Sequence, residues 1–235
     1  MKKFIFDVDG TLTPSRCQIN SEFLLFMMFF ATRNDVYLVT GSDRDKTLEQ
    51  VGVDLCNASQ RVYNCSGSDA YEQDENVYRD EWTLPWDVER FLYDELDYSQ
   101  FIMRNGNHIE RRPGGVNFSI LGRAKDPFLG RKEYMEWDKE TNERADIADR
   151  LRSNYPGLSV ALGGQTGIDI GPWGSDKSQI LRDFSENDEL YFFGDRMEPG
   201  GNDHSLGEAV KNMGGYTYQV KNWEETRTIL EGIHD

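Results

Sequence analysis

Two aspartates stand two residues apart at the end of a short apolar segment near the start of the chain. Phe4-Ile5-Phe6 continues into Asp7-Val8-Asp9-Gly10-Thr11. Carboxylates this close raise each other's pKa and repel, so a fold keeps them together mainly when a cation lies between them or one of them reacts. One carboxylate can attack a phosphorus atom while its neighbour moves a proton. The pair therefore predicts phosphoryl-transfer chemistry, and a pair that only caps a turn is the alternative.

Three further segments carry side chains that suit a phosphoryl group and a cation. Thr40-Gly41-Ser42 follows a second predicted strand, where a hydroxyl and turn amides can hold a phosphoryl oxygen. Lys177 begins a predicted helix, where a cation opposes the helix dipole unless an anion lies nearby; an exposed lysine is the alternative. Asp195 and Asp203 follow a third predicted strand, and Asp203 could equally cap the next helix. Four carboxylates at one sheet edge favour a hard divalent cation such as Mg²⁺.

The first and last thirds of the chain alternate strand and helix, which predicts a parallel sheet with these residues at its carboxyl edge. The expected strands are 4–8, 35–41, 189–194 and 216–220, and the expected helices are 21–32, 43–50, 177–184, 203–213 and 223–231. The run Phe23 to Ala31 is apolar throughout but too short to span a bilayer. We therefore expect a fully buried helix there.

The middle of the chain has a different pattern. It predicts a helix at 87–97, one long charged helix at 133–153, and strands at 100–103, 108–112, 116–121, 158–162 and 167–170. Glycine turns between these strands indicate antiparallel pairing, and such a segment between two α/β halves is typical of an inserted lid. We predict a core at 1–79 and 173–235 and a cap at 80–172.

The composition excludes several classes of protein. The chain has 235 residues, 37% of them hydrophobic, and a net charge of −16. A surface this acidic repels nucleic acids and anionic membranes, so we expect neither as a partner. Cys17, Cys56 and Cys65 are odd in number and lack metal-binding spacing, which favours free thiols in a reducing compartment. Asp7 and Asp9 fall where a signal peptide would be apolar, so we expect a cytoplasmic protein.

The motifs DxDGT, TGS, a helix-opening lysine and GDxxxxxxND, in this order, resemble those of the haloacid dehalogenase superfamily of phosphotransferases. The resemblance implies a Rossmann-like parallel-sheet α/β core with an inserted α+β cap. It implies that Asp7 is the nucleophile that becomes a phospho-aspartate and that Asp9 is the general acid/base. Thr40 and Lys177 would hold and neutralise the transferring phosphoryl group. The metal would be Mg²⁺, and the expected metal-binding residues are Asp7, Asp9 (through its backbone carbonyl), Asp195 and Asp203.

The middle segment resembles, more narrowly, the cap (type IIB) of the eukaryote-type phosphomannomutases. The resemblance rests on Arg112-Pro-Gly-Gly-Val-Asn117-Phe-Ser-Ile-Leu-Gly-Arg123, on Arg131, and on Gly163-Gly-Gln-Thr-Gly-Ile-Asp169. It implies that lid arginines bind the distal phosphate of the sugar, and arginine clusters are the expected readers of phosphate dianions. Solvated surface arginines are the alternative for each one alone. The expected substrate-binding residues are Arg16, Gly41, Ser42, Arg112, Asn117, Arg123, Arg131 and Asp169.

Three positions depart from the family pattern. Gly167 replaces the usual Ser, which removes one contact to a substrate hydroxyl. Thr40-Gly41 replaces Gly-Gly, as in related sugar phosphatases. The segment Asn64 to Ser68 departs from an ENG turn. These departures leave the sugar less well defined than the chemistry.

Three functions follow as hypotheses. The first is a phosphohexose mutase that interconverts mannose (or glucose) 1-phosphate and 6-phosphate, with a hexose 1,6-bisphosphate as activator. The second is a sugar-phosphate phosphatase, in which water accepts the phosphoryl group from Asp7. The third is a binding module without catalysis, against which the complete motif set argues. The resemblance also implies a homodimer through the cap and a place in GDP-mannose biosynthesis, while His108 and His204 receive no role.

Overall fold

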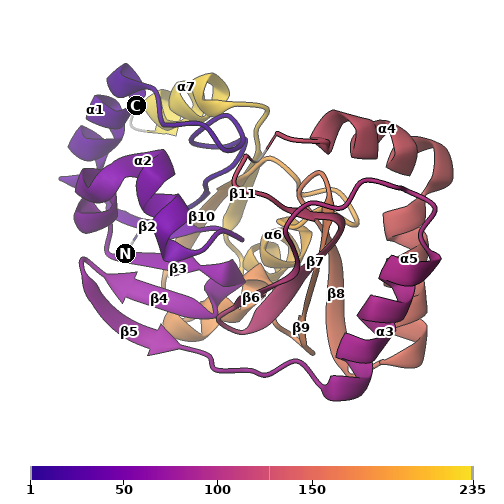
Figure 1. The fold of residues 1–235 in the computed structure, drawn as a ribbon. Coiled ribbons are helices and arrows are strands. Elements are labelled where there is room, and N and C mark those ends of the chain that lie inside the picture. Colours follow the sequence, from indigo (N-terminus) through magenta and orange to yellow (C-terminus); the bar gives the residue numbers. More distant parts are fainter. Residues whose placement is uncertain (1, 127, 234–235) are drawn as a thin grey trace. The chain divides into compact units, whose positions relative to one another are not determined.

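The computed structural model describes residues 2–126 and 128–233, which divide into two compact units (Figure 1). The core unit holds the described residues up to Arg79 and from Asp176 onward. The inserted unit holds those from Asp80 to Ser175. An α/β core is therefore interrupted in sequence by a second unit with its own sheet.

The core unit is built on a seven-stranded sheet. The first five strands in spatial order are mutually parallel, and the last two add an antiparallel hairpin at one edge. The predicted parallel sheet is confirmed, whereas the three strands after the second helix were not predicted. In spatial order the strands are β11 (Tyr216–Gln219), β10 (Glu189–Gly194), β1 (Lys2–Asp7), β2 (Asp35–Val39), β3 (Arg61–Asn64), β4 (Asp69–Glu72) and β5 (Glu75–Arg79).

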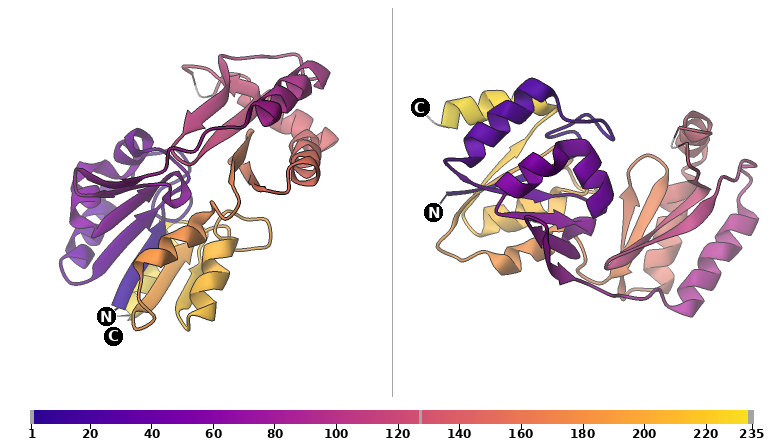
Figure 2. Two further views of the ribbon diagram at one scale, coloured as in Figure 1. Left: turned by 90° about the horizontal axis from the view of Figure 1, so that it is seen from below. Right: turned by 60° about the vertical axis from the view of Figure 1, so that its left-hand side comes forward.

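Helices cover both faces of this sheet. On one face, α1 (Ser21–Ala31), α2 (Arg44–Ala58) and α7 (Trp223–Ile233) pack on inward side chains of β1 and β10 such as Phe6 and Phe193. On the other face, α6 (His204–Asn212) and the short 3₁₀ helix η2 (Lys177–Asp183) pack on Ile5 and Phe192. Figure 1 and the right panel of Figure 2 show α1 (indigo) beside α7 (yellow). The layers hold the carboxyl ends of β1 and β10 side by side.

The helix α1 is buried on one side only, so the expectation of a fully buried helix was wrong. Phe23, Met27 and Phe30 are buried at helical spacing, whereas Leu25 and Phe29 are 71% and 56% exposed. Asn20 caps this helix, because its side-chain oxygen accepts the N–H groups of the second and third helical residues. Among the described helices, none is both long enough and apolar enough to cross a bilayer.

The inserted unit contains an antiparallel sheet in the order β6 (Asn107–Arg112), β7 (Gly115–Arg123), β9 (Gly167–Pro172) and β8 (Leu158–Gly163). Its apolar core joins side chains of these strands to those of α3 (Trp86–Tyr98), α4 (Arg131–Thr141) and α5 (Glu143–Asn154). Residues 116, 118 and 120 of β7 belong to this core. Strand alternation therefore turns the side chains of 117 and 119 toward the opposite face.

Two predictions about the inserted unit were wrong. Residues 100–103 form no strand, because the Arg104 guanidinium donates to backbone carbonyls of residues 101 and 103. The predicted helix at 133–153 is two helices, because Asn142 adopts a left-handed conformation (φ 55°) between α4 and α5. The Asp138 carboxylate accepts the backbone N–H of Arg144 at 2.8 Å and so supports the new start.

Candidate active site

The loop after β1 brings a backbone turn against Asp195. Gly10 has φ +85°, and a Cβ atom there would lie 2.3 Å from Asp195 Oδ2. The Val8 carbonyl accepts the N–H groups of Leu12 and Thr13, both at 3.0 Å, which closes the turn. Only glycine fits both the conformation and the close approach. The DxDG sequence is thus explained by geometry as well as by the chemistry of its acids.

Lys177 lies between two aspartates in the interior of the core unit. Its Nζ donates to Asp7 Oδ1 at 2.5 Å and to Asp203 Oδ1 at 2.6 Å. The lysine is 1% exposed, so the interpretation as an exposed surface lysine is wrong. The helix that it opens is η2, a 3₁₀ helix capped by Asp176, whose carboxylate accepts the Ser178 N–H at 2.8 Å.

Asp203 uses its side chain for this cluster rather than for helix capping. Its Oδ2 accepts the Arg196 N–H at 3.1 Å, and no hydrogen bond joins its carboxylate to α6. Asp7, Asp195 and Asp203 can each place one oxygen so that all lie within 4.8 Å of one another. With Lys177, three carboxylates leave a net charge of −2. This donor set fits a hard divalent cation.

The electrostatics of the cluster favour a bound cation. Burial raises the pKa of Asp7 well above its usual value, and the neighbouring Asp203 raises it further although Lys177 opposes the shift. Burial and Asp203 likewise raise the pKa of Asp195 to about 6. Burial opposes the charged form of Lys177, yet Asp203 and Asp7 raise its pKa. A divalent cation would offset the repulsion that these shifts reflect.

The Asp9 carboxylate is hydrogen-bonded to groups outside the acidic cluster. Its Oδ1 accepts the Arg16 backbone N–H at 2.8 Å and the Gln50 side-chain amide at 3.0 Å. Gln50 also donates to Thr13 Oγ1 at 3.3 Å. Arg16 itself is exposed, with φ 60°. Sequence reasoning missed Gln50, because a glutamine within a helix carries no motif.

The Thr40-Gly41-Ser42 turn follows β2 and is hydrogen-bonded to segment 64–68, which departs from the family pattern. Thr40 is buried, and its Oγ1 accepts the Ser42 N–H at 3.1 Å. The backbone N–H groups of Cys65 and Ser66 donate to the carbonyls of Ser42 and Thr40, both at 2.8 Å. Segment 64–68 therefore supports the turn through its backbone.

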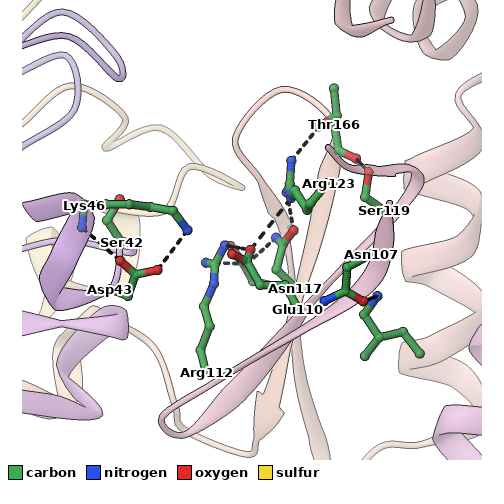
Figure 3. Close-up of polar contacts among 12 residues, drawn as sticks. Ser42, Asp43, Lys46, Asn107, Glu110, Arg112, Asn117, Ser119, Arg123 and Thr166 are labelled. Atoms are coloured by element: carbon green, nitrogen blue, oxygen red, sulfur yellow. Dashed lines mark hydrogen bonds and ion pairs between the residues drawn. The ribbon is translucent and has the colours of Figure 1, made fainter. Parts of the chain in front are cut away.

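The inserted unit carries a polar row across its sheet. Glu110 of β6, Asn117 of β7 and Asp169 of β9 are register partners in turn. Asn117 Nδ2 donates to Asp169 Oδ1 at 2.6 Å. Arg112 donates to Glu110 at 2.5 Å, and Arg123 donates to Asn117. Figure 3 shows the two guanidinium groups directed toward this row.

The remaining residues predicted in the cap have other partners. Arg131 is buried at the start of α4 and donates to Gln165 Oε1 at 3.1 Å. Arg123 also donates to Thr166 Oγ1 at 3.0 Å. Sequence reasoning missed Glu110, Gln165 and Thr166 as partners of the arginines. His108 and His204 each bond a backbone carbonyl within their own unit, those of Ser119 and Met197.

Known proteins are similar to this chain in sequence along nearly its whole length. The family model described as eukaryotic phosphomannomutase matches residues 24–235. The chain belongs to the eukaryotic phosphomannomutase family. Similar relatives include a phosphomannomutase of Saccharomyces cerevisiae, 30% identical over 96% of this chain and 91% of the yeast protein. Another is a phosphomannomutase of Triticum aestivum, 33% identical over 89% of this chain and 87% of the wheat protein.

Solved structures show the fold of this phosphomannomutase family member. A haloacid dehalogenase-like hydrolase from Bacteroides thetaiotaomicron aligns over 99% of both chains with a TM-score of 0.64 and 16% identity. A sugar phosphatase of subclass IIB aligns over 100% of this chain and 99% of its own, with a TM-score of 0.63 and 14% identity. The predicted fold class, a haloacid dehalogenase-type α/β core with an inserted α+β unit, is confirmed.

Proposed function

We propose that this chain is a phosphohexose mutase that interconverts mannose (or glucose) 1-phosphate and 6-phosphate through a phospho-aspartate at Asp7. The observation that carries the proposal is the buried Asp7–Lys177–Asp203 arrangement, with Asp195 beside it, in a chain of the eukaryotic phosphomannomutase family. Uncatalysed phosphate-ester cleavage is extremely slow, and positioning with charge neutralisation supplies most of its catalysis.

The reaction would proceed by two transfers. An Asp7 carboxylate oxygen attacks the phosphorus of a hexose bisphosphate, and the bond from phosphorus to the sugar oxygen breaks. Asp9 gives its proton to that sugar oxygen, and in the second transfer it takes the proton from the hydroxyl that attacks the phospho-aspartate. Lys177 and Thr40 neutralise and orient the phosphoryl oxygens, together with the amides of Gly41 and Ser42.

The residues that would hold Mg²⁺ are Asp7, Asp195 and Asp203, with the backbone carbonyl of Asp9. Their oxygen ligands and net negative charge suit this ion, which supplies charge neutralisation at the transferring phosphoryl group. Lys177 keeps its ammonium bonded to Asp7 and Asp203, so it orders two of these carboxylates.

The distal phosphate of the sugar would be bound by the arginines of the inserted unit. We assign this role to Arg112, Arg123 and Arg131, with Arg16 from the core unit. Asn117 and Asp169 would contact sugar hydroxyls. Guanidinium groups bind phosphate through paired, charge-assisted hydrogen bonds, which supports the assignment. We further propose that a hexose 1,6-bisphosphate activates the enzyme, that the reaction serves GDP-mannose biosynthesis, and that the protein is a cytoplasmic homodimer joined through the cap.

A phosphatase of the same fold is the second candidate. The solved structures similar in fold include a sugar phosphatase and a trehalose-6-phosphate phosphatase. The Thr40-Gly41 sequence, in place of Gly-Gly, resembles related sugar phosphatases. The same Asp7 chemistry would then end with water as the acceptor. The difference between the two lies in how well water is excluded from the phospho-aspartate.

Asp7→Asn tests the chemistry common to both. Wild type and variant are incubated with Mg²⁺, mannose 1-phosphate and a trace of hexose 1,6-bisphosphate, and the sugar phosphates are quantified. We expect the variant to lose turnover while it still binds mannose 1-phosphate by calorimetry. Asp149→Asn, at an exposed position on α5, is the matched control and should keep wild-type turnover. Turnover that survives in the Asp7 variant would refute the nucleophile assignment.

A further inference from the structure

Glu110 is an acidic residue among the arginines of the inserted unit. Its Oε2 accepts a hydrogen bond from Arg112 at 2.5 Å and lies 3.8 Å from Nε of Arg123. The three side chains are largely withdrawn from solvent, at 24%, 15% and 17% exposed. One carboxylate therefore bridges two guanidinium groups on the polar face of the sheet (Figure 3).

The register of the sheet fixes where this carboxylate stands. Glu110 is paired with Asn117 on the neighbouring strand, and Asn117 is paired with Asp169. Arg112 follows Glu110 by two positions on β6, so both side chains lie on the same face. Arg123 reaches this face from the end of β7 and bonds Asn117 and Thr166. The backbone thus brings Glu110 to both arginines.

Two guanidinium groups on one face repel each other, and each has several rotatable bonds. A carboxylate between them offsets the repulsion and limits each side chain to one orientation. Asp169 Oδ1 also lies 3.8 Å from Nη1 of Arg112, so two carboxylates balance the charge of the two guanidinium groups, and an incoming phosphate is bound through the directed N–H donors of the arginines. Arginine side chains that are already ordered lose less conformational entropy when the ligand binds, so binding is stronger.

We propose that Glu110 is a positioning residue that orders Arg112 and Arg123 as a preformed phosphate clamp. The proposal deepens the proposed function and rests on it for the identity of the ligand, a hexose phosphate. Glu110 does not touch the reacting atoms in this account and acts through the two arginines.

The opposite effect is the competing possibility. A carboxylate near an anion-binding group also repels the anion, so its removal would strengthen phosphate binding. The two effects have opposite signs, and a binding measurement separates them. The ordering effect predominates in our proposal because the carboxylate bonds Arg112 directly and lies beside Arg123.

The test uses the full chain and four proteins: wild type, Glu110→Gln, Glu110→Asp and Glu89→Gln. Glu89 is the matched control because its carboxylate pairs with Arg111, the neighbour of Arg112, at 2.7 Å. Arg111 lies on the other side of β6, so this pair is outside the proposed clamp. The Kd for mannose 1-phosphate is measured by calorimetry, KM and kcat by sugar-phosphate turnover, and folding by thermal unfolding.

We expect Glu110→Gln to raise the Kd and KM for mannose 1-phosphate about tenfold, with kcat changed less than threefold, because ordering an arginine costs affinity. Glu110→Asp keeps the charge and should recover part of the affinity. Glu89→Gln should match wild type. If Glu110→Gln fails to fold, Glu110→Asp carries the test: its shorter side chain should raise the Kd above those of wild type and Glu89→Gln, and a Kd equal to or below theirs would overturn the proposal.

Three results would overturn the proposal: tighter binding by Glu110→Gln, equal effects of Glu110→Gln and Glu89→Gln, or a fall in kcat with KM unchanged. The proposed function fails separately. A wild type that binds mannose 1-phosphate without isomerising it would refute the mutase assignment and leave the comparison of Kd values valid. A wild type that binds no hexose phosphate would refute both.

Discussion

Replacing Lys177 with methionine removes the ammonium that bonds both Asp7 and Asp203. The lysine is fully buried, with Nζ 2.5 and 2.6 Å from the two carboxylates. Deleting one partner of a buried ion pair costs about 3–5 kcal/mol, since the remaining charge is left uncompensated. In a chain of this size, each kcal/mol of lost stability lowers the midpoint of thermal unfolding by about 2–4 °C, so the midpoint without metal should fall by about 6–20 °C.

The same variant should depend more on a divalent cation than wild type does. Without the ammonium, the cluster of three carboxylates has a larger net negative charge. Bound Mg²⁺ restores positive charge in place of the ammonium. Thermal unfolding is therefore measured with and without Mg²⁺. We expect a larger midpoint increase on adding Mg²⁺ in Lys177→Met than in wild type, together with loss of turnover because the phosphoryl group loses a neutralising contact.

The control is Lys211→Met. Lys211 pairs with Glu208 at 2.9 Å on the surface of α6, with both side chains more than half exposed. Exposed pairs contribute little, so the midpoint and the effect of Mg²⁺ should stay near wild type. The reasoning would be refuted if Lys177→Met were as stable as this control, or if Mg²⁺ stabilised it less than wild type.

Two further predictions concern the metal and the cap. Because burial and a neighbouring carboxylate raise the pKa of Asp195 to about 6, protons compete with Mg²⁺ below that pH, and calorimetry should show the Kd rising about tenfold per pH unit there. A carboxyl with a raised folded-state pKa loses its stabilising contribution as pH rises, so without metal the contribution of Asp195 to the free energy of unfolding should fall between about pH 4 and 6. A pH-independent Mg²⁺ affinity would contradict both statements. A Cβ atom at Gly167 would lie 2.6 Å from the Asn117 amide and 2.7 Å from the Arg123 guanidinium, so Gly167→Ala should cost about 1–3 kcal/mol of stability and weaken mannose 1-phosphate binding. Gly157→Ala, where nothing lies within 4 Å of a new Cβ, is its control, and equal affinities of the two variants would refute the steric argument.

Much of the fold follows from local patterns in the sequence. Apolar runs such as Phe4–Phe6, each followed by a turn, predict parallel strands, and the helix expected at 21–32 corresponds to α1. The strand β4 could not be predicted in this way. Its residues carry little apolar alternation, and the hairpin with β5 depends on side-chain contacts such as that between Asp69 and Arg79. A local pattern does not report such contacts.

For the candidate site, too, the sequence predicted some of the residues and missed others. Asp7 and Lys177 are 170 positions apart, and only the order of the motifs suggested that they meet. Glu110 was missed because one acid in an acidic chain looks like surface, and only the strand register places it between two arginines. The break at Asn142 was missed because the charged pattern continues across it, and its left-handed conformation is a backbone property.

The most direct test of the central claim is a phosphorus NMR time course. The protein is given Mg²⁺, mannose 1-phosphate and a trace of hexose 1,6-bisphosphate, and the phosphorus signals are followed until they are constant. The account predicts a growing mannose 6-phosphate signal with little inorganic phosphate. Inorganic phosphate as the main product would contradict the mutase assignment and identify the chain as a phosphatase.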